Sequence, residues 1–114
     1  MRPKVYISGP LTSSGSVREN LERAMGAARA LIDAGFAPFC PHLTYHIDLG
    51  EEIPHATWME IELPWAAVAD AVLRLPGESV GADIEVAHAE RLGVSVFHSI
   101  AELSEHFTLE SAAA

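Results

Sequence analysis

The sequence of 114 residues predicts a single α/β domain, because four short apolar segments alternate with longer segments of helical pattern. The first apolar segment, residues 5–8, is rich in β-branched and aromatic side chains and stops at Gly9-Pro10, as a strand does at a turn. A chain of this length with 49% hydrophobic residues can bury one substantial core. We expect one domain over residues 1–108, followed by a flexible tail over residues 109–114.

The second predicted element is a helix over residues 16–34, which begins at Ser16, a suitable N-cap, and stops at Gly35. The residues expected on its buried apolar stripe are Leu21, Met25, Ala28 and Ile32. A second strand over residues 36–40 contains Pro38, which has no amide hydrogen to donate. We therefore expect this strand at an edge of the sheet.

Residues 41–53 are predicted to form a loop that is long enough to be functional rather than a simple connection. This loop carries His42, Tyr45 and His46. A helix over residues 54–69 follows, with Pro54 favourable at its first position. Because Pro64 removes an amide donor and disfavours helical geometry at the residue before it, we expect a kink or two abutting short helices there.

The remaining predicted elements are a strand over residues 70–75, a turn over 76–79, a helix over 80–92, a strand over 94–97 and a short helix over 100–107. Four strands separated by helices imply a parallel sheet with right-handed crossovers and helices on both faces. We expect a flavodoxin-like or Rossmann-like three-layer domain with strand order 2-1-3-4. In that order, the loops that follow the first and third strands flank one crevice.

Composition excludes several classes of function. A net charge of −9 argues against binding a nucleic-acid duplex, which requires lysine and arginine on the phosphates, although a helix N-terminus can still bind a small anion. No apolar segment approaches about twenty residues, so we expect no membrane span and a cytoplasmic location. Cys40 is the only cysteine, which we expect to be a buried small hydrophobe. The histidines lack metal-ligand spacing, so we expect no zinc site and no cofactor.

The segment over residues 75–85 predicts a strand, a turn and a helix start, with Gly77, Ser79 and Gly81 around the turn. Such a turn can present backbone amides to an anionic ligand. Local chemistry alone favours an ordinary helix start, with Ser79 as the N-cap and Asp83 complementing the helix dipole. The spacing fits neither a dinucleotide-binding fingerprint nor a P-loop.

Three features together resemble the nucleoside 2-deoxyribosyltransferase superfamily. They are Tyr6 with Ser8-Gly9-Pro10 after the first strand, Glu62 eight residues before Asp70, and the segment Ser-Val-Gly-Ala-Asp-Ile-Glu-Val-Ala-His-Ala over residues 79–89. The superfamily includes the transferases, the deoxynucleoside 5′-monophosphate N-glycosidases and small uncharacterised relatives, which this chain resembles most. The resemblance spans residues 5–99.

The resemblance implies a role for each matching carboxyl and hydroxyl group. Glu85 takes the place of the nucleophile, Glu62 that of the acid that assists the departing base, and Tyr6 that of the tyrosine that holds the nucleophile. Ser79 stands where the transferases carry an acid and the monophosphate glycosidases carry a serine, which favours a 5′-phosphate on the substrate. The further candidates for substrate binding are Ser8, Gly9, Ser13, Ser14, His42 and Gly81.

Each assignment has a structural alternative. Tyr6 can be a core tyrosine with a satisfied hydroxyl, Glu62 a solvated helix residue and His42 a loop cap. Trp58 and Trp65 fit packing or a subunit interface better than base stacking. The predicted function is N-glycosidase activity on a nucleoside 5′-monophosphate, and the alternatives are deoxyribosyl transfer between bases, non-catalytic nucleotide sensing, or a structural role. We expect a homo-oligomer that binds a small nucleoside or nucleotide.

Overall fold

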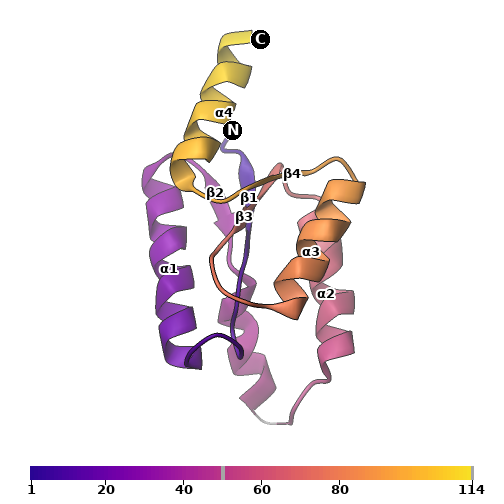
Figure 1. The fold of residues 1–114 in the computed structure, drawn as a ribbon. Helices are drawn as coiled ribbons and strands as arrows, with labels where there is room; N and C mark the ends of the chain where they lie inside the picture. Colours follow the sequence, from indigo (N-terminus) through magenta and orange to yellow (C-terminus); the bar gives the residue numbers. More distant parts are fainter. Residues whose placement is uncertain (50, 114) are drawn as a thin grey trace.

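The computed structural model describes residues 1–49 and 51–113 and has the predicted α/β architecture. The strands are β1 (Lys4–Ser8), β2 (Ala37–Phe39), β3 (Ala71–Arg74) and β4 (Ser95–Phe97). They pair in parallel in the order β2-β1-β3-β4, which confirms the predicted order and the edge position of β2 (Figure 1).

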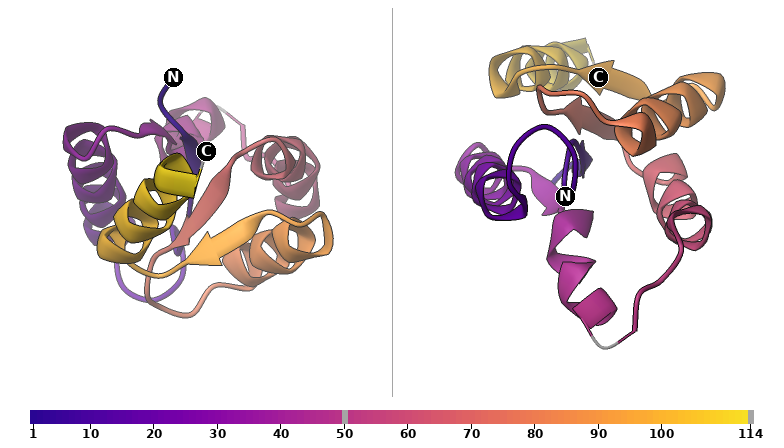
Figure 2. Two further views of the ribbon diagram at one scale, coloured as in Figure 1. Left: turned by 90° about the horizontal axis from the view of Figure 1, so that it is seen from above. Right: turned by 60° about the horizontal axis from the view of Figure 1, so that its bottom comes forward.

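Helices cover both faces of the sheet (Figure 2). The α-helices are α1 (Val17–Asp33), α2 (His55–Ala67), α3 (Val80–Arg91) and α4 (Ile100–Ala113), and the 3-10 helix η1 (Pro41–Leu49) follows β2. One core forms where α1 and α4 pack on the sheet, and a second, smaller core forms where α2 and α3 pack on the other face. The protein is therefore a single three-layer domain. No helix in the described part of the chain is long and apolar enough to cross a membrane.

Side chains of β1 alternate between these two cores. Val5 and Ile7 belong to the core beneath α1 and α4, whereas Tyr6 belongs to the core beneath α2 and α3. Ser8, two residues after Tyr6, points to the same face as Tyr6. Both hydroxyl groups thus face α3, the helix that carries the predicted nucleophile.

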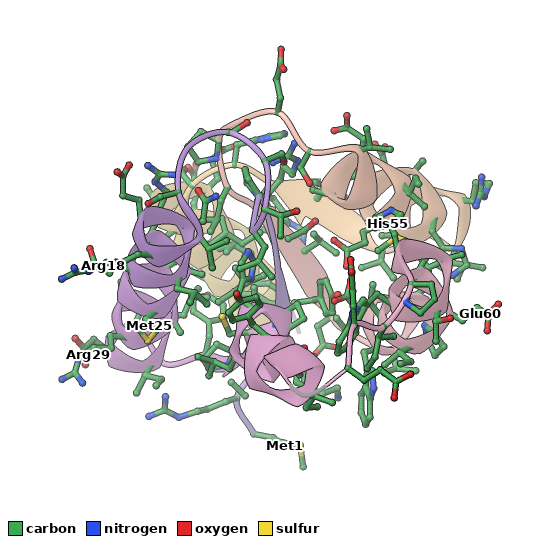
Figure 3. All side chains as sticks on the ribbon, turned by 90° about the horizontal axis from the view of Figure 1, so that it is seen from below. Met1, Arg18, Met25, Arg29, His55 and Glu60 are labelled. Carbon is green, nitrogen blue, oxygen red and sulfur yellow. The ribbon has the colours of Figure 1, made fainter. Side chains whose placement is uncertain are left out.

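Of the predicted apolar stripe of α1, Ala28 packs against the core, whereas Met25 and Ile32 lie outside it. The buried residues of this helix are Asn20, Ala24 and Leu31. Met25 and Ile32 are 43% and 49% exposed, and Figure 3 shows Met25 on the outer side of the helix. The small side chain of Ala24 permits close approach of the helix to the sheet. The Asn20 side-chain amide donates hydrogen bonds to two carbonyl groups of the preceding loop. Together these contacts rotate the helix relative to the predicted orientation.

Three other predicted elements differ in form. The expected loop over residues 41–53 begins with the helical turns of η1. Helix α2 runs through Pro64 as one helix rather than two, because the missing proline amide removes one hydrogen bond while neighbouring turns persist. Helix α4 continues beyond residue 107 to Ala113, through leucine, glutamate and alanine, which favour helix. Ala114 lies outside the described residues, and the flexibility of the tail stays a prediction.

The loops after β1 and β3 contact each other at the carboxyl ends of the strands. Gly77 has φ +111°, and a Cβ atom there would lie 2.8 Å from the Pro10 ring. The hydroxyls of Ser13 and Ser14 each donate a hydrogen bond to the carbonyl of Glu78, at 2.8 and 2.7 Å. These contacts place the two loops side by side at the switch point of the sheet.

Candidate active site

A cavity of about 300 Å³ opens at this end of the sheet. Figure 3 views the molecule from that end, with His55 labelled on α2. The cavity lies between the β1–α1 loop, η1, α2 and the start of α3. The predicted site residues that line it are Gly9, Ser13, His42, Glu62, Ser79, Gly81 and Glu85. The switch point of the sheet therefore holds the cavity, as the strand order predicts.

Glu85 lies at the inner wall of the cavity and is only 4% exposed. Its Oε1 atom accepts a hydrogen bond of 2.8 Å from the Ser8 hydroxyl, and its Oε2 atom accepts a hydrogen bond from the Tyr6 hydroxyl. Tyr6 and Ser8 are buried beneath Glu85 in the sheet. They orient the carboxyl group and stabilise its charged form. Tyr6 is thus both a core residue and the partner of Glu85.

Glu62 reaches the cavity from α2 and shares a hydrogen bond with Glu85. Burial, followed by the nearby charge of Glu85, raises the pKa of Glu62 to about 8. Pro64 does not turn Glu62 away from the site, and Glu62 is half-buried rather than a solvated helix residue.

Burial also raises the pKa of Glu85, but hydrogen bonds from Tyr6, Ser8 and Glu62 and the charge of Arg74 oppose this effect. Two carboxyl groups in contact titrate as a coupled pair and do not both ionise easily. Because Glu85 accepts hydrogen bonds from Tyr6 and Ser8, we assign the shared proton to Glu62 and the negative charge to Glu85. Burial, together with the charge of Glu85, raises the pKa of Tyr6, so its hydroxyl stays a neutral donor.

The start of α3 forms another part of the cavity wall. The Ser79 hydroxyl caps the helix by accepting a hydrogen bond of 3.1 Å from the Ala82 amide, as the ordinary helix-start interpretation predicts. Ser79 also lines the cavity. The amides of Val80 and Gly81 make no backbone hydrogen bond to the described residues. The cap and the anion-binding interpretation are thus compatible.

Ser13 and Ser14 make structural contacts. A serine hydroxyl has one proton to donate, and in both residues it is donated to the Glu78 carbonyl. Ser13 lines the cavity, whereas Ser14 is not among the lining residues. Their contact with a phosphate group stays a prediction, and the structure uses both to join the two loops.

His42 is 4% exposed, and its Nε2 atom lies 3.2 Å from the carbonyl oxygens of Gly9 and Pro10. Because carbonyl oxygens only accept hydrogen bonds, Nε2 carries the proton. Burial lowers the pKa of His42, so the ring is neutral. Its Nδ1 atom lies 3.8 Å from the thiol of Cys40, which is half-buried. His42 therefore caps the β1 loop, as one interpretation expected, and also lines the cavity.

The sequence analysis placed Tyr45 in a functional loop, but it assigned Trp58 to packing or an interface, whereas Trp58 lines the cavity. The lining residues not predicted as substrate-binding include Thr12, Tyr45, His55, Trp58 and Met59. Three of them lie on α2 at positions 55, 58 and 59, spaced so that they share one helix face with Glu62. This spacing is visible in the sequence once Glu62 is placed at the site. Trp65, by contrast, is 54% exposed and stacks on Phe39.

The described residues contain no group of three or more histidine, cysteine, aspartate or glutamate side chains that could hold a metal ion. The titratable side chains on the cavity wall come from different elements and include His42, His55, Glu62 and Glu85. Together with the hydroxyl groups on the wall, these side chains offer carboxyl, hydroxyl and imidazole chemistry.

The raised pKa of Glu62 predicts a specific pH dependence of stability. Between its ordinary pKa of 4.5 and about 8, the folded chain binds more protons than the unfolded chain, so stability falls as pH rises. Replacing Glu62→Gln removes this loss. The melting temperature of the variant, relative to wild type, should therefore increase from pH 5 to pH 9. Glu60→Gln, on the outer side of the same helix, is the control and should follow wild type. Parallel curves for Glu62→Gln and wild type would contradict the assignment.

The sequence has no significant match among curated proteins. The profile of the DUF7768 family, described as a domain of unknown function, matches residues 3–99. These residues include all four strands, helices α1 to α3 and every candidate site residue described above. The match covers most of the chain, and the protein therefore belongs to the DUF7768 family.

Proposed function

We propose that the protein is an N-glycosidase that cleaves the bond between base and sugar in a nucleoside or deoxynucleoside 5′-monophosphate, with Glu85 as the nucleophile. The observation that carries this proposal is the Glu62–Glu85 pair at the wall of a cavity large enough for a small molecule. One carboxyl group is ionised and held by Tyr6 and Ser8, and the other keeps a proton near neutral pH. Unequal carboxyl groups of this kind divide the work of nucleophile and acid.

The first chemical step forms a covalent intermediate. A Glu85 carboxylate oxygen attacks the anomeric carbon of the sugar, and the bond from that carbon to the base nitrogen breaks. The electron pair of that bond leaves with the base, and Glu62 donates its proton to the base. The transition state carries positive charge on the sugar, which the Glu85 carboxylate stabilises.

The second step releases the sugar. A water molecule attacks the anomeric carbon, gives its proton to the Glu62 carboxylate, and the bond to Glu85 breaks. Both carboxyl groups return to their starting states.

A sugar that enters the cavity must first separate the two carboxyl groups, so part of the binding free energy is spent on breaking their hydrogen bond.

The wall of the cavity suits the two ends of a nucleotide. Tyr45, Trp58 and Met59 offer apolar and aromatic surface for a base. At the start of α3, the Ser79 hydroxyl and the amides of Val80 and Gly81 can donate hydrogen bonds to phosphate oxygens, which the helix dipole reinforces. The buried carboxyl pair supports catalysis rather than passive sensing. Such a pair costs stability, and a carboxyl group that keeps its proton near neutral pH is typical of a catalytic acid.

We further propose that the protein acts as a homo-oligomer in the cytoplasm, where nucleotides are metabolised. Helix α2 contacts the sheet on one side but exposes Ile61 and Trp65 on another, and Val68, directly after the helix, is exposed as well. Together with half-exposed Phe39, these residues form an apolar surface that supports self-association. Partners are small molecules and further copies of the chain, since the net charge of −9 disfavours a nucleic-acid duplex.

Replacing Glu85→Gln should abolish release of free base, because an amide is not a nucleophile. When released base is measured by chromatography, we expect the turnover of deoxynucleoside monophosphates to fall by about a thousandfold or more. Glu90→Gln, an exposed position on the same helix, is the matched control and should keep wild-type turnover. Turnover of Glu85→Gln close to wild type would remove Glu85 from the mechanism. If the wild-type protein releases the first base only when a second base is added, it is a transferase instead.

Replacing Ser79→Ala should lower kcat/KM for a 5′-monophosphate by about tenfold and change that for the nucleoside little, because one phosphate hydrogen bond is lost. Ser16→Ala is the matched control, since Ser16 caps α1 in the same way outside the cavity. Both variants lose a helix cap, worth about 1 kcal/mol of stability. Equal losses for nucleotide and nucleoside in Ser79→Ala would argue against a phosphate site there.

A further inference from the structure

Arg74 ends β3 with a guanidinium group that is mostly withdrawn from water. Its side chain is 12% exposed. The Nη1 atom donates a hydrogen bond to the carbonyl of Leu75, and Nη2 donates to the carbonyl of Gly77 at 2.9 Å and to Oδ1 of Asp83 at 3.2 Å. One side chain thus joins the end of the strand, the turn and the first turn of α3. Such planar, multidentate contacts are specific to arginine.

The turn that Arg74 holds determines where α3 begins. Gly77 lies at its centre with φ +111°, and the helix starts at Val80, three residues later. Glu85 lies in the second turn of the helix. A shift of this turn would therefore move the Glu85 carboxyl group away from the Tyr6 and Ser8 hydroxyls that hold it.

Arg74 also points to the face of the sheet that carries Glu85. Arg74 is the register partner of Ser8 in the parallel pair of β1 and β3. Register partners of neighbouring strands project to the same face, and the Ser8 hydroxyl donates to Glu85 on that face. The positive charge of Arg74 opposes the rise of the Glu85 pKa that burial causes.

Other charged and titratable groups surround the pair. The groups that act on Glu85 are Tyr6 and Ser8 from β1, Glu62 from α2 and Arg74 from β3. Further polar side chains on the same cavity wall are His42 and Tyr45 from η1 and His55 from α2. Asp83 faces Arg74 from the solvent side and partly neutralises it. Hydrogen bonds from Tyr6, Ser8 and Glu62 lower the pKa of Glu85 most, and Arg74 adds a positive charge that acts in the same direction.

We propose that Arg74 is a positioning residue for Glu85: it fixes the turn from which α3 starts, and it places a positive charge on the face of the sheet that carries Glu85. The geometric part concerns the chain alone. The consequence for turnover rests on the proposed glycosidase function, in which ionised Glu85 attacks the sugar.

The charge is tested by following the glutamate side-chain carboxyl carbons by ¹³C nuclear magnetic resonance during a pH titration of the full chain. The Glu85→Gln spectrum assigns the Glu85 signal. In Arg74→Met, the titration midpoint of Glu85 should rise by at least about half a pH unit, because a nearby positive charge is lost. Arg91→Met removes the same charge at the far end of α3 and should leave the midpoint unchanged. An unchanged midpoint in Arg74→Met would overturn the proposal.

Arg74→Lys separates charge from position, because lysine keeps the charge but not the planar fork. Its Glu85 midpoint should stay near wild type, while kcat/KM falls at every pH as the turn loosens. In Arg74→Met, the acidic limb of the pH profile of kcat/KM should shift to higher pH, by the same amount as the titration midpoint of Glu85. Equal midpoint shifts in the lysine and methionine variants would show that charge is not the cause.

Two results separate this proposal from the proposed function. A raised midpoint in Arg74→Met, in a protein without nucleotide turnover, would support the role of Arg74 and refute the glycosidase. Nucleotide turnover by the wild-type protein, with a Glu85 midpoint that does not change in Arg74→Met, would support the glycosidase and refute the role of Arg74. If circular dichroism shows that Arg74→Met does not fold, Asp83→Asn tests the same charge. This variant removes the carboxylate that partly neutralises Arg74, so the titration midpoint of Glu85 should fall. An unchanged Glu85 midpoint would contradict the proposal.

Discussion

The site depends on one interaction, that between the neighbouring carboxyl groups of Glu62 and Glu85. Two carboxylates in contact repel each other strongly, so the pair keeps a proton at neutral pH. Hydrogen bonds from Tyr6 and Ser8 and the charge of Arg74 favour ionisation of Glu85. The contact is costly for stability, and the rest of the site decides which member of the pair carries the charge.

The parallel sheet makes this arrangement possible. Because β1 lies between β2 and β3, its end is next to the loop that begins α3, and its alternation directs Tyr6 and Ser8 toward that helix. Helix α2 approaches closely enough that a Cβ atom on Gly81 would lie 3.3 Å from His55. Glu62 can therefore reach Glu85 across the cavity. A different strand order would separate these groups even with the same secondary structure.

The strand order and the N-caps Ser16 and Ser79 were predictable from patterns along the chain, whereas the pairing of Tyr6 with Glu85 was implied by the family resemblance of the motifs. The rotation of α1 was not, since Asn20 is polar and its burial depends on carbonyls of a loop whose path the pattern does not encode. Arg74 and the cavity face of α2 were missed for a related reason. Their importance arises from contacts between elements, whereas sequence patterns describe positions within one element.

The most direct test of the account is to trap the covalent intermediate on Glu85. A deoxynucleoside 5′-monophosphate with fluorine at the 2′ carbon destabilises the positively charged transition states and slows both steps, so a good leaving base allows the intermediate to accumulate. Mass spectrometry of the intact chain and of its peptides should then show one added sugar phosphate on Glu85, and none in Glu85→Gln. Substrate turnover without any adduct, or with an adduct on another residue, would contradict the account.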